Sequence, residues 1–127
     1  MRILLIEPDR LLATTYQSSL EKGGFEVNLV AAAQAAIMAA DKFTPDIVIL
    51  ELQLIEHSGI EFLYEFRSYP EWQDIPVIVH TQVPPGEFSD SWQLLKNQLG
   101  VEVYLYKPYT SIANLLKQVN ALIKVKA

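Results

Sequence analysis

Asp46-Ile47-Val48-Ile49-Leu50-Glu51 is an uninterrupted apolar run that ends in an acid. A strand made only of Val, Ile and Leu is typical of a parallel strand that is covered on both faces. Glu51 would then lie at the carboxyl end of a buried strand, which is where open α/β folds place their sites. The stretch therefore predicts a fold class and a candidate functional residue together.

Similar apolar runs flank this stretch and alternate with segments of helical spacing. The predicted strands cover Ile3–Glu7, Phe25–Val30, Ile47–Glu51, Pro76–Thr81 and Val101–Tyr106. The predicted helices cover Arg10–Lys22, Ala33–Lys42, Ile60–Ser68, a segment from Ser89 or Asp90 to Leu99, and Ser111–Lys124. Asp9 is expected to cap the first helix and Thr110 the last. Five strands, each followed by a helix, predict an α/β fold with a doubly wound five-stranded parallel sheet.

The carboxyl ends of the predicted strands carry the polar candidates for a site. Right-handed crossovers place all of these ends at one edge of the sheet. Glu7, Glu51, Thr81 and Lys107 each end a strand, and Asp9 follows Glu7 closely. The sequence therefore predicts one polar site in which acids, a hydroxyl group and a lysine converge.

The composition is that of an ordinary globular domain. With 127 residues, 50% hydrophobic and 20% charged, we expect a single domain over residues 1–127. The formal net charge of −5 argues against a nucleic-acid partner, because an acidic domain repels phosphates. The absence of cysteine excludes disulfides and thiolate metal sites and fits a cytoplasmic location. No apolar run approaches the ~18 residues of a membrane span, and no leader pattern precedes the first strand, so we expect no membrane contact.

Four short segments set the polar residues in a distinctive order. They are Ile6-Glu7-Pro8-Asp9, Ile49-Leu50-Glu51-Leu52-Gln53-Leu54, Val79-His80-Thr81 and Tyr106-Lys107-Pro108. With Gly59 and Tyr104, they make essentially the whole chain resemble the receiver domain of bacterial two-component response regulators. In that family an acidic pair follows the first strand and a phospho-accepting Asp ends the third. Thr or Ser ends the fourth strand, and Lys-Pro follows the fifth.

The resemblance implies a flavodoxin-like sheet with strand order 2-1-3-4-5 and a role in phosphorelay signalling. It places Glu51 at the phospho-acceptor position and Glu7 and Asp9 in the acidic pocket. It places the switch and pocket residues at Thr81, Tyr104 and Lys107. The implied partners are a histidine kinase, an output protein or another regulator. A homodimer through the fourth helix, fifth strand and fifth helix is also implied, and no enzymatic activity is expected.

This chain departs from the family pattern at the acceptor and beside it. Glu51 replaces the family's Asp, and Pro8 replaces the second acid of the acidic pair. A Glu side chain is longer by one carbon–carbon bond, roughly 1.5 Å, and a misplacement of ~1 Å can cost ~100-fold in rate. Glu7 and Glu51 are the remaining candidates for a Mg²⁺ site, but Pro8 removes a ligand, and we expect no cofactor. The chain between Thr81 and Lys107 is also longer than usual in the family.

The sequence leaves two roles open for Glu51, and both predict that it is not phosphorylated. In one, Glu51 imitates a phosphoryl group by pairing with Lys107 and Thr81, and so holds the domain in an active-like arrangement. In the other, Glu51 and Lys107 form a residual ion pair in a fold that is retained for its surface. Either way, we expect the domain to act through protein–protein contacts.

Three other functions would each place different demands on the sequence. A phosphorylation-competent receiver would use Glu51 or a nearby acid. A flavodoxin-like cofactor-binding domain would need phosphate-binding backbone donors after the first strand, where this chain has Glu7-Pro8-Asp9-Arg10. An enzyme would need a nucleophile elbow, a phosphate-binding glycine loop or a catalytic triad, and the sequence contains no such motif.

The remaining aromatic residues and histidines carry weaker expectations. Tyr104 is expected at an interface, together with Trp92. Tyr106 is expected to point into the core, Tyr109 to cover the last helix and Trp72 to cover the end of the third helix. His80 is expected to pack against a neighbouring helix, and His57 to be solvated in a loop.

Overall fold

The computed structural model describes residues 1–126, and in it the central apolar run forms β3 (Ile47–Leu50) in the middle of a five-stranded parallel sheet. The other strands are β1 (Arg2–Ile6), β2 (Glu26–Val30), β4 (Val77–Thr81) and β5 (Val101–Tyr106). Their order is β2-β1-β3-β4-β5, and every neighbouring pair is parallel. The predicted fold class and strand order are confirmed. The expected domain range also includes Ala127, which lies outside the described residues.

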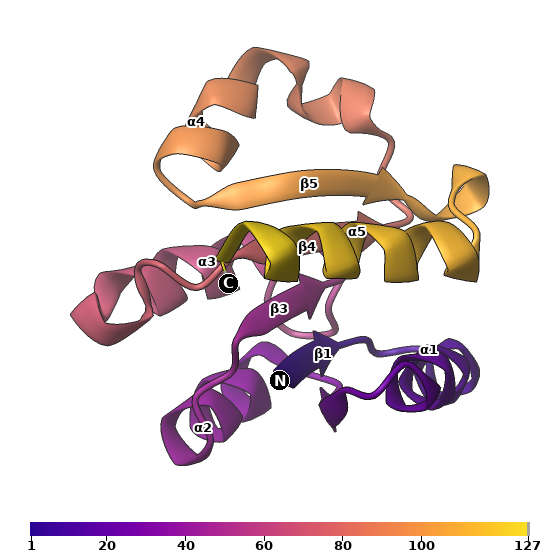
Figure 1. Cartoon of the computed structure of the whole chain (residues 1–127). Helices are drawn as coiled ribbons and strands as arrows, with labels where there is room; N and C mark the ends of the chain where they lie inside the picture. Colours follow the sequence, from indigo (N-terminus) through magenta and orange to yellow (C-terminus); the bar gives the residue numbers. More distant parts are fainter. Residues whose placement is uncertain (127) are drawn as a thin grey trace.

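Within the described residues, five α-helices cover the two faces of the sheet (Figure 1). They are α1 (Arg10–Lys22), α2 (Ala33–Lys42), α3 (Gly59–Ser68), α4 (Trp92–Asn97) and α5 (Ile112–Lys126). Helices α1 and α5 pack on one face, and α2, α3 and α4 pack on the other. Within residues 1–126, none of the helices is long and apolar enough to cross a bilayer.

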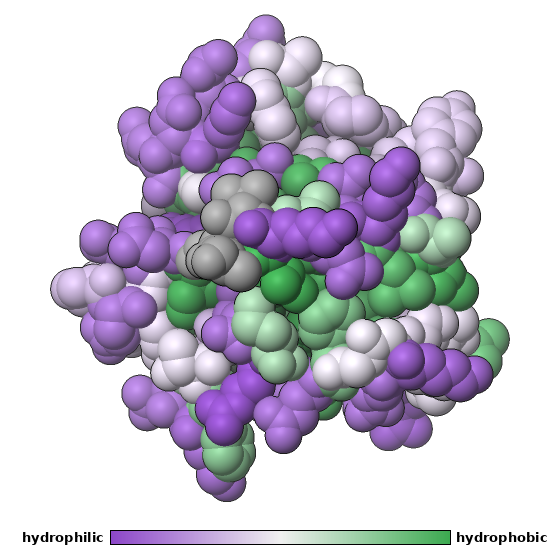
Figure 2. Space-filling view, viewed as in Figure 1, coloured by the Kyte–Doolittle hydropathy of each residue, from purple (hydrophilic) through white to green (hydrophobic). Residues whose placement is uncertain are grey.

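The two faces are filled by alternate residues of the same strands. Ile3 and Leu5 of β1 pack towards α1 and α5, whereas Leu4 and Ile6 pack towards α2 and α3. This alternation follows from the two-residue repeat of a strand. It explains the uninterrupted apolar runs at Ile3–Ile6 of β1 and in β3: both of their faces are buried. Figure 2 shows apolar surface between α5 and α1 on the first of these faces.

The helix ends follow local chemistry that the sequence predicted in part. Asp9 caps α1, as expected, because its carboxylate accepts a hydrogen bond from the Leu12 amide at 3.0 Å. The expected cap of the last helix was wrong. Ser111 is the cap, since its hydroxyl accepts from the Asn114 amide at 3.1 Å, whereas the Thr110 hydroxyl donates back to the Tyr106 carbonyl.

The segment between β4 and β5 differs most from expectation. We predicted a loop at residues 83–86 and then one helix from Ser89 or Asp90 to Leu99. Instead, a 3₁₀ helix, η2 (Pro85–Ser91), precedes an α4 of only six residues. Proline is compatible with a first helical turn, so the helical turns begin at Pro85 and not after the two prolines. Figure 1 shows α4 beyond β5, at the top of that view.

A partly buried arginine, Arg67, joins several segments at the edge of the sheet where β4 and β5 begin. The Arg67 guanidinium donates to the carbonyls of Trp72 at 2.6 Å, Ile75 at 2.7 Å, Leu99 at 2.9 Å and Gly100 at 3.2 Å. A Cβ at Gly100 would lie 2.5 Å from an Arg67 nitrogen, and Gly100 has a positive φ of 67°. Arg67 thereby joins the end of α3 to the segments that enter β4 and β5.

Candidate functional site: a lysine between two glutamates

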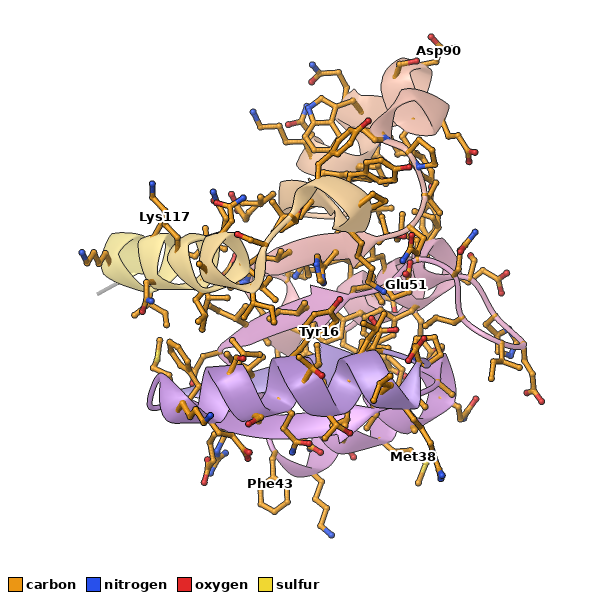
Figure 3. All side chains as sticks on the ribbon, turned by 90° about the vertical axis from the view of Figure 1, so that its right-hand side faces the viewer. Tyr16, Met38, Phe43, Glu51, Asp90 and Lys117 are labelled. Atoms are coloured by element: carbon orange, nitrogen blue, oxygen red, sulfur yellow. The ribbon has the colours of Figure 1, made fainter. Side chains whose placement is uncertain are left out.

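The carboxyl edge of the sheet carries a buried polar cluster. Glu7 follows β1, Glu51 follows β3, Thr81 ends β4 and Lys107 follows β5. Their exposed fractions are 4%, 3%, 0% and 9%, so all four are buried. The structure thus brings together four residues that the sequence placed at the ends of strands. In Figure 3, Glu51 lies well inside the outline of the molecule, whereas Asp90 lies at an outer tip.

Lys107 bridges two carboxylates. Its ammonium nitrogen lies 2.5 Å from Oε1 of Glu7 and 2.7 Å from Oε1 of Glu51. Burial disfavours the ammonium, but its hydrogen bonds to Glu51 and Glu7 outweigh this effect and raise the pKa of Lys107 above its usual 10.5. The lysine therefore stays charged and neutralises one of the two buried negative charges.

The Glu51 carboxylate accepts four hydrogen bonds from the chain. Oε1 accepts from Lys107 and from the Gln82 amide at 3.2 Å, and Oε2 accepts from the Thr81 hydroxyl and from the Gln53 amide at 3.0 Å. Burial alone would raise the pKa of Glu51. The hydrogen bonds from Lys107, Thr81 and Gln53 outweigh burial and lower it, so Glu51 is a carboxylate at neutral pH.

The second acid of the expected pocket is placed elsewhere. Asp9 is exposed, and its carboxylate caps α1; only its backbone amide reaches the site, by donating to Glu7 at 3.1 Å. Pro8 offers no side-chain oxygen. The two carboxylates that remain, Glu7 and Glu51, are both bonded to Lys107. This donor set fits a magnesium ion poorly, because such an ion needs several oxygens in octahedral geometry.

A chain of contacts leads from Glu51 to the surface segment formed by η2 and α4. The Val83 amide donates to the Thr81 hydroxyl oxygen at 3.1 Å, and the Tyr104 hydroxyl donates to the Val83 carbonyl at 2.7 Å. Burial, with smaller contributions from nearby Glu51 and Glu87, raises the pKa of Tyr104 to about 12. Tyr104 is therefore a neutral hydrogen-bond donor at any ordinary pH.

The ring of Tyr104 packs against two aromatic residues of that segment. Its centroid lies 6.1 Å from that of Phe88 and 6.2 Å from that of Trp92. The expected interface residue is therefore half-buried beneath η2 and α4. The sequence had associated Trp92 with Tyr104, but it gave no sign of the contact through Phe88, because that contact depends on the unpredicted 3₁₀ helix.

His80 lies on the other side of the site and packs against α1, as expected. The His80 ring packs edge to face against the ring of Tyr16, with centroids 4.9 Å apart. Only 3% of the surface of His80 is exposed. Burial and the nearby charge of Lys107 lower the pKa of His80 to about 4. Figure 3 shows Tyr16 on α1, beside the sheet. His80 is therefore neutral at pH 7.

Of the other aromatic residues, some lie where expected and some do not. Trp72 covers the end of α3, with its ring stacked 5.1 Å from that of Phe66. Tyr109 was expected to cover the last helix, and this was wrong: it is 87% exposed. Tyr106 is half-buried and not in the core, and it meets Tyr109 edge to face. His57 is exposed in its loop, as expected, and pairs with Glu61 at 3.1 Å.

Comparisons with known proteins identify the family of the chain. The chain matches the family described as "Response regulator receiver domain" over residues 3–120. It is 33% identical over 124 residues to the transcriptional regulatory protein QseB of Haemophilus influenzae, a match that covers 98% of this chain and 53% of QseB.

Solved structures share its fold. A sensor protein from Polaromonas sp. JS666 has a TM-score of 0.86 at 24% identity, and the match covers 99% of this chain and 98% of that one. The chemotaxis response regulator CheY4 of Vibrio cholerae has a TM-score of 0.82 at 21% identity, over 94% and 96% of the two chains. The chain spans about half the length of the curated relatives it matches.

Proposed function

This chain belongs to the response regulator receiver family of two-component signalling, and we propose that it is an atypical receiver that acts without being phosphorylated itself. Receiver domains are signalling modules, so the proposal concerns how this one carries its signal. The observation that supports the proposal most is the hydrogen bonding of Glu51. Each of its two carboxylate oxygens accepts two hydrogen bonds from the chain.

Phosphoryl transfer needs an acceptor oxygen that is free to attack and a metal ion that neutralises the developing charge. In this chain, attack by Glu51 would first require the loss of a hydrogen bond from Lys107, Thr81, Gln53 or Gln82. The carboxylate also lies one bond further from the backbone than that of the family's aspartate. Both features argue against phosphorylation at Glu51.

The Lys107 ammonium supplies the positive charge beside Glu7 and Glu51. Lys107 contacts both Glu7 and Glu51 and balances part of their charge. A magnesium ion would have to displace this ammonium while finding further oxygen ligands that Pro8 and Asp9 do not provide. The proposed receiver therefore uses no metal cofactor.

Of the two roles left open for Glu51, the contacts favour the imitation of a phosphoryl group. A phosphate offers ~2 negative charges and three acceptor oxygens; Glu51 offers one charge and two oxygens, and it binds Lys107 and Thr81 with them. Thr81 points inward to Glu51, and Tyr104 is held to the adjoining Val83. In the receiver family, an inward-pointing hydroxyl group and a repositioned aromatic residue accompany the active state. We therefore place this domain in a fixed, active-like arrangement.

The proposed partners are other signalling proteins: a histidine kinase, an output protein or another regulator. A homodimer through α4, β5 and α5 belongs to the same proposal. Neither nucleic acid nor a membrane is a proposed direct partner, in keeping with the net charge of −5, and the proposed location is the cytoplasm.

Acetyl phosphate and Mg²⁺, followed by intact mass spectrometry, test the central claim. The expected result is no mass gain in the wild-type chain. The Glu51→Asp variant is the informative comparison: modification of this variant alone would show that only the acceptor was lost, and no modification of either would show that Pro8 matters too. A hydroxylamine-labile phosphoryl group mapped to Glu51 of the wild-type chain would contradict the proposal.

A further inference from the structure

A surface groove lies between α2 and α3, beside the loop that follows Glu51. It consists of two adjoining hollows of about 340 and 220 Å³ that share Ala33, Gln34 and His57 in their walls. We call it the α2–α3 groove. Because the two hollows share three wall residues, they adjoin and form one depression.

The walls of the α2–α3 groove are acidic. Glu56 lines the first hollow, and Glu61 and Glu65 line the second. No lysine or arginine is among the described residues that line either hollow. Glu61 pairs with His57, but neither Glu56 nor Glu65 has an ion-pair partner within the described residues. Glu61 and Glu65 are also four residues apart on α3, a spacing at which like charges repel. The groove therefore favours a cationic occupant.

The groove also has an apolar element. Leu54 and Phe62 line its walls and pack with the core beneath. Ile55 stands at its rim with 73% of its surface exposed, one of the highest exposures of a large apolar residue in the described chain. An exposed isoleucine beside unpaired carboxylates suits a ligand that presents apolar and positive side chains together.

The loop that forms one wall is tied to the buried site. The Gln53 amide donates to Oε2 of Glu51, and the Gly59 amide donates to the Leu52 carbonyl at 2.8 Å. These two bonds hold the ends of the loop that carries Ile55 and His57. One end of the loop that forms this wall is therefore anchored on the Glu51 carboxylate.

We propose that the α2–α3 groove binds a basic amphipathic segment of a partner protein. Lysine or arginine side chains of this segment pair with Glu56 and Glu65, and its apolar side chains pack on Ile55. The inference depends on the proposed function, in that it names the kind of partner through which a receiver without a phosphorylation cycle acts. The acidic walls repel the phosphates of nucleic acids and lipid headgroups, so the charge selects a protein segment.

The test uses a fluorescently labelled synthetic helical peptide of lysine and leucine, titrated with the full chain at physiological ionic strength and followed by anisotropy. The double variant Glu56→Lys/Glu65→Lys is compared with Glu21→Lys/Glu71→Lys, which changes the net charge equally at exposed positions outside the groove. Binding is expected to weaken about tenfold in the groove variant, because each exposed pair contributes only a few-fold. The control variant is expected to change it less than about twofold.

Three outcomes overturn the inference: no saturable binding, equal weakening in both variants, or stronger binding of a matched glutamate–leucine peptide. Sedimentation of the chain without peptide can give a fourth contradicting outcome. If the chain self-associates and only the groove variant abolishes this, the occupant of the groove is a second copy of the chain. Circular dichroism verifies that each variant is folded. The result is separable from phosphorylation of Glu51: a chain that is phosphorylated can still bind the peptide in the groove, and a chain that is not can fail to bind it.

Discussion

Lys107 and Glu51 are joined by a 2.7 Å contact between Nζ and Oε1, which links the end of β5 to the centre of the sheet. Both side chains are almost fully buried, and the same ammonium also holds Glu7. Buried charges of this kind stabilise the fold only as a complete set, because each loses its hydration on burial. The consequences of breaking the set are therefore large and specific.

Replacement of Lys107 by methionine removes the shared cation and leaves two buried carboxylates close together. We expect the free energy of unfolding to fall by ~3–5 kcal/mol, the usual cost of leaving a buried charge without its partner. Urea unfolding measures it. Lys117→Met on the exposed face of α5 is the matched control, with an expected change within ~0.5 kcal/mol. A loss below ~1 kcal/mol for Lys107→Met would show that the cluster is hydrated and weakly coupled.

Glu51→Gln is expected to disturb the packing of Trp92 at a distance. The substitution removes the negative charge that binds Lys107 and accepts from Thr81, so the contacts through Val83 to Tyr104 lose their anchor. The chain has two tryptophans, and in a Trp72→Phe background Trp92 is the sole tryptophan reporter.

The emission maximum of Trp92 should shift in Glu51→Gln and stay constant in the exposed control Glu61→Gln. An unchanged maximum in both variants would favour the alternative role, in which Glu51 and Lys107 are a residual ion pair without influence on the surface.

His80 makes stability depend on pH in the acid range. Its pKa is about 4 in the folded chain and near 6.5 in the unfolded chain. The unfolded state therefore binds a proton first, so stability is full above pH 6.5 and falls as the pH drops towards 4. At ~1.4 kcal/mol per pH unit, the loss is ~3 kcal/mol at most.

Replacement of His80 by phenylalanine, which keeps the ring beside Tyr16, should flatten the stability profile between pH 6.5 and about 4.5. Glu51 has a lowered pKa, so its own contribution is present above its unfolded value of 4.5 and is lost as the pH falls through the folded value. The variant should therefore still lose stability below that point. An unaltered profile above pH 4.5 would place the titration on another group.

Gly59→Ala is expected to destabilise the chain even though alanine is the better helix former. A Cβ at this position would lie 2.8 Å from Cα of Leu52 and 3.0 Å from the Glu51 carbonyl oxygen, and both are backbone atoms that must move. We expect a loss of ~1–3 kcal/mol by thermal or urea unfolding. Gly86→Ala, where a Cβ meets nothing within 4 Å, is the control and should be neutral or slightly stabilising.

The sequence predicted the sheet well because its signals are local. The apolar runs around Ile3–Ile6 and Ile47–Leu50 are buried on both faces, and their short length and β-branched residues favour strands over helices. The crossover rule then placed Glu51 and Lys107 at the same edge. That inference needed only the order of the elements and not their packing.

The parts that escaped prediction depend on contacts between distant residues. The sequence allowed Asp9 either to cap the first helix or to join the acidic pocket. In the structure its carboxylate accepts from the Leu12 amide and caps α1. Nothing in the sequence around Arg67 indicates that four carbonyls from later segments surround it. The η2 turns place Phe88 against Tyr104, a residue that follows sixteen positions later.

The four donors around Glu51 also bear on how the cell would govern such a protein. A conventional receiver is reset when its phosphoryl group is hydrolysed, but a carboxylate built into the polypeptide does not leave. On our proposal, the signal would persist for as long as each molecule exists. Its strength would then be set by the rates of transcription, translation and proteolysis, and by competition among partners for a limited number of copies.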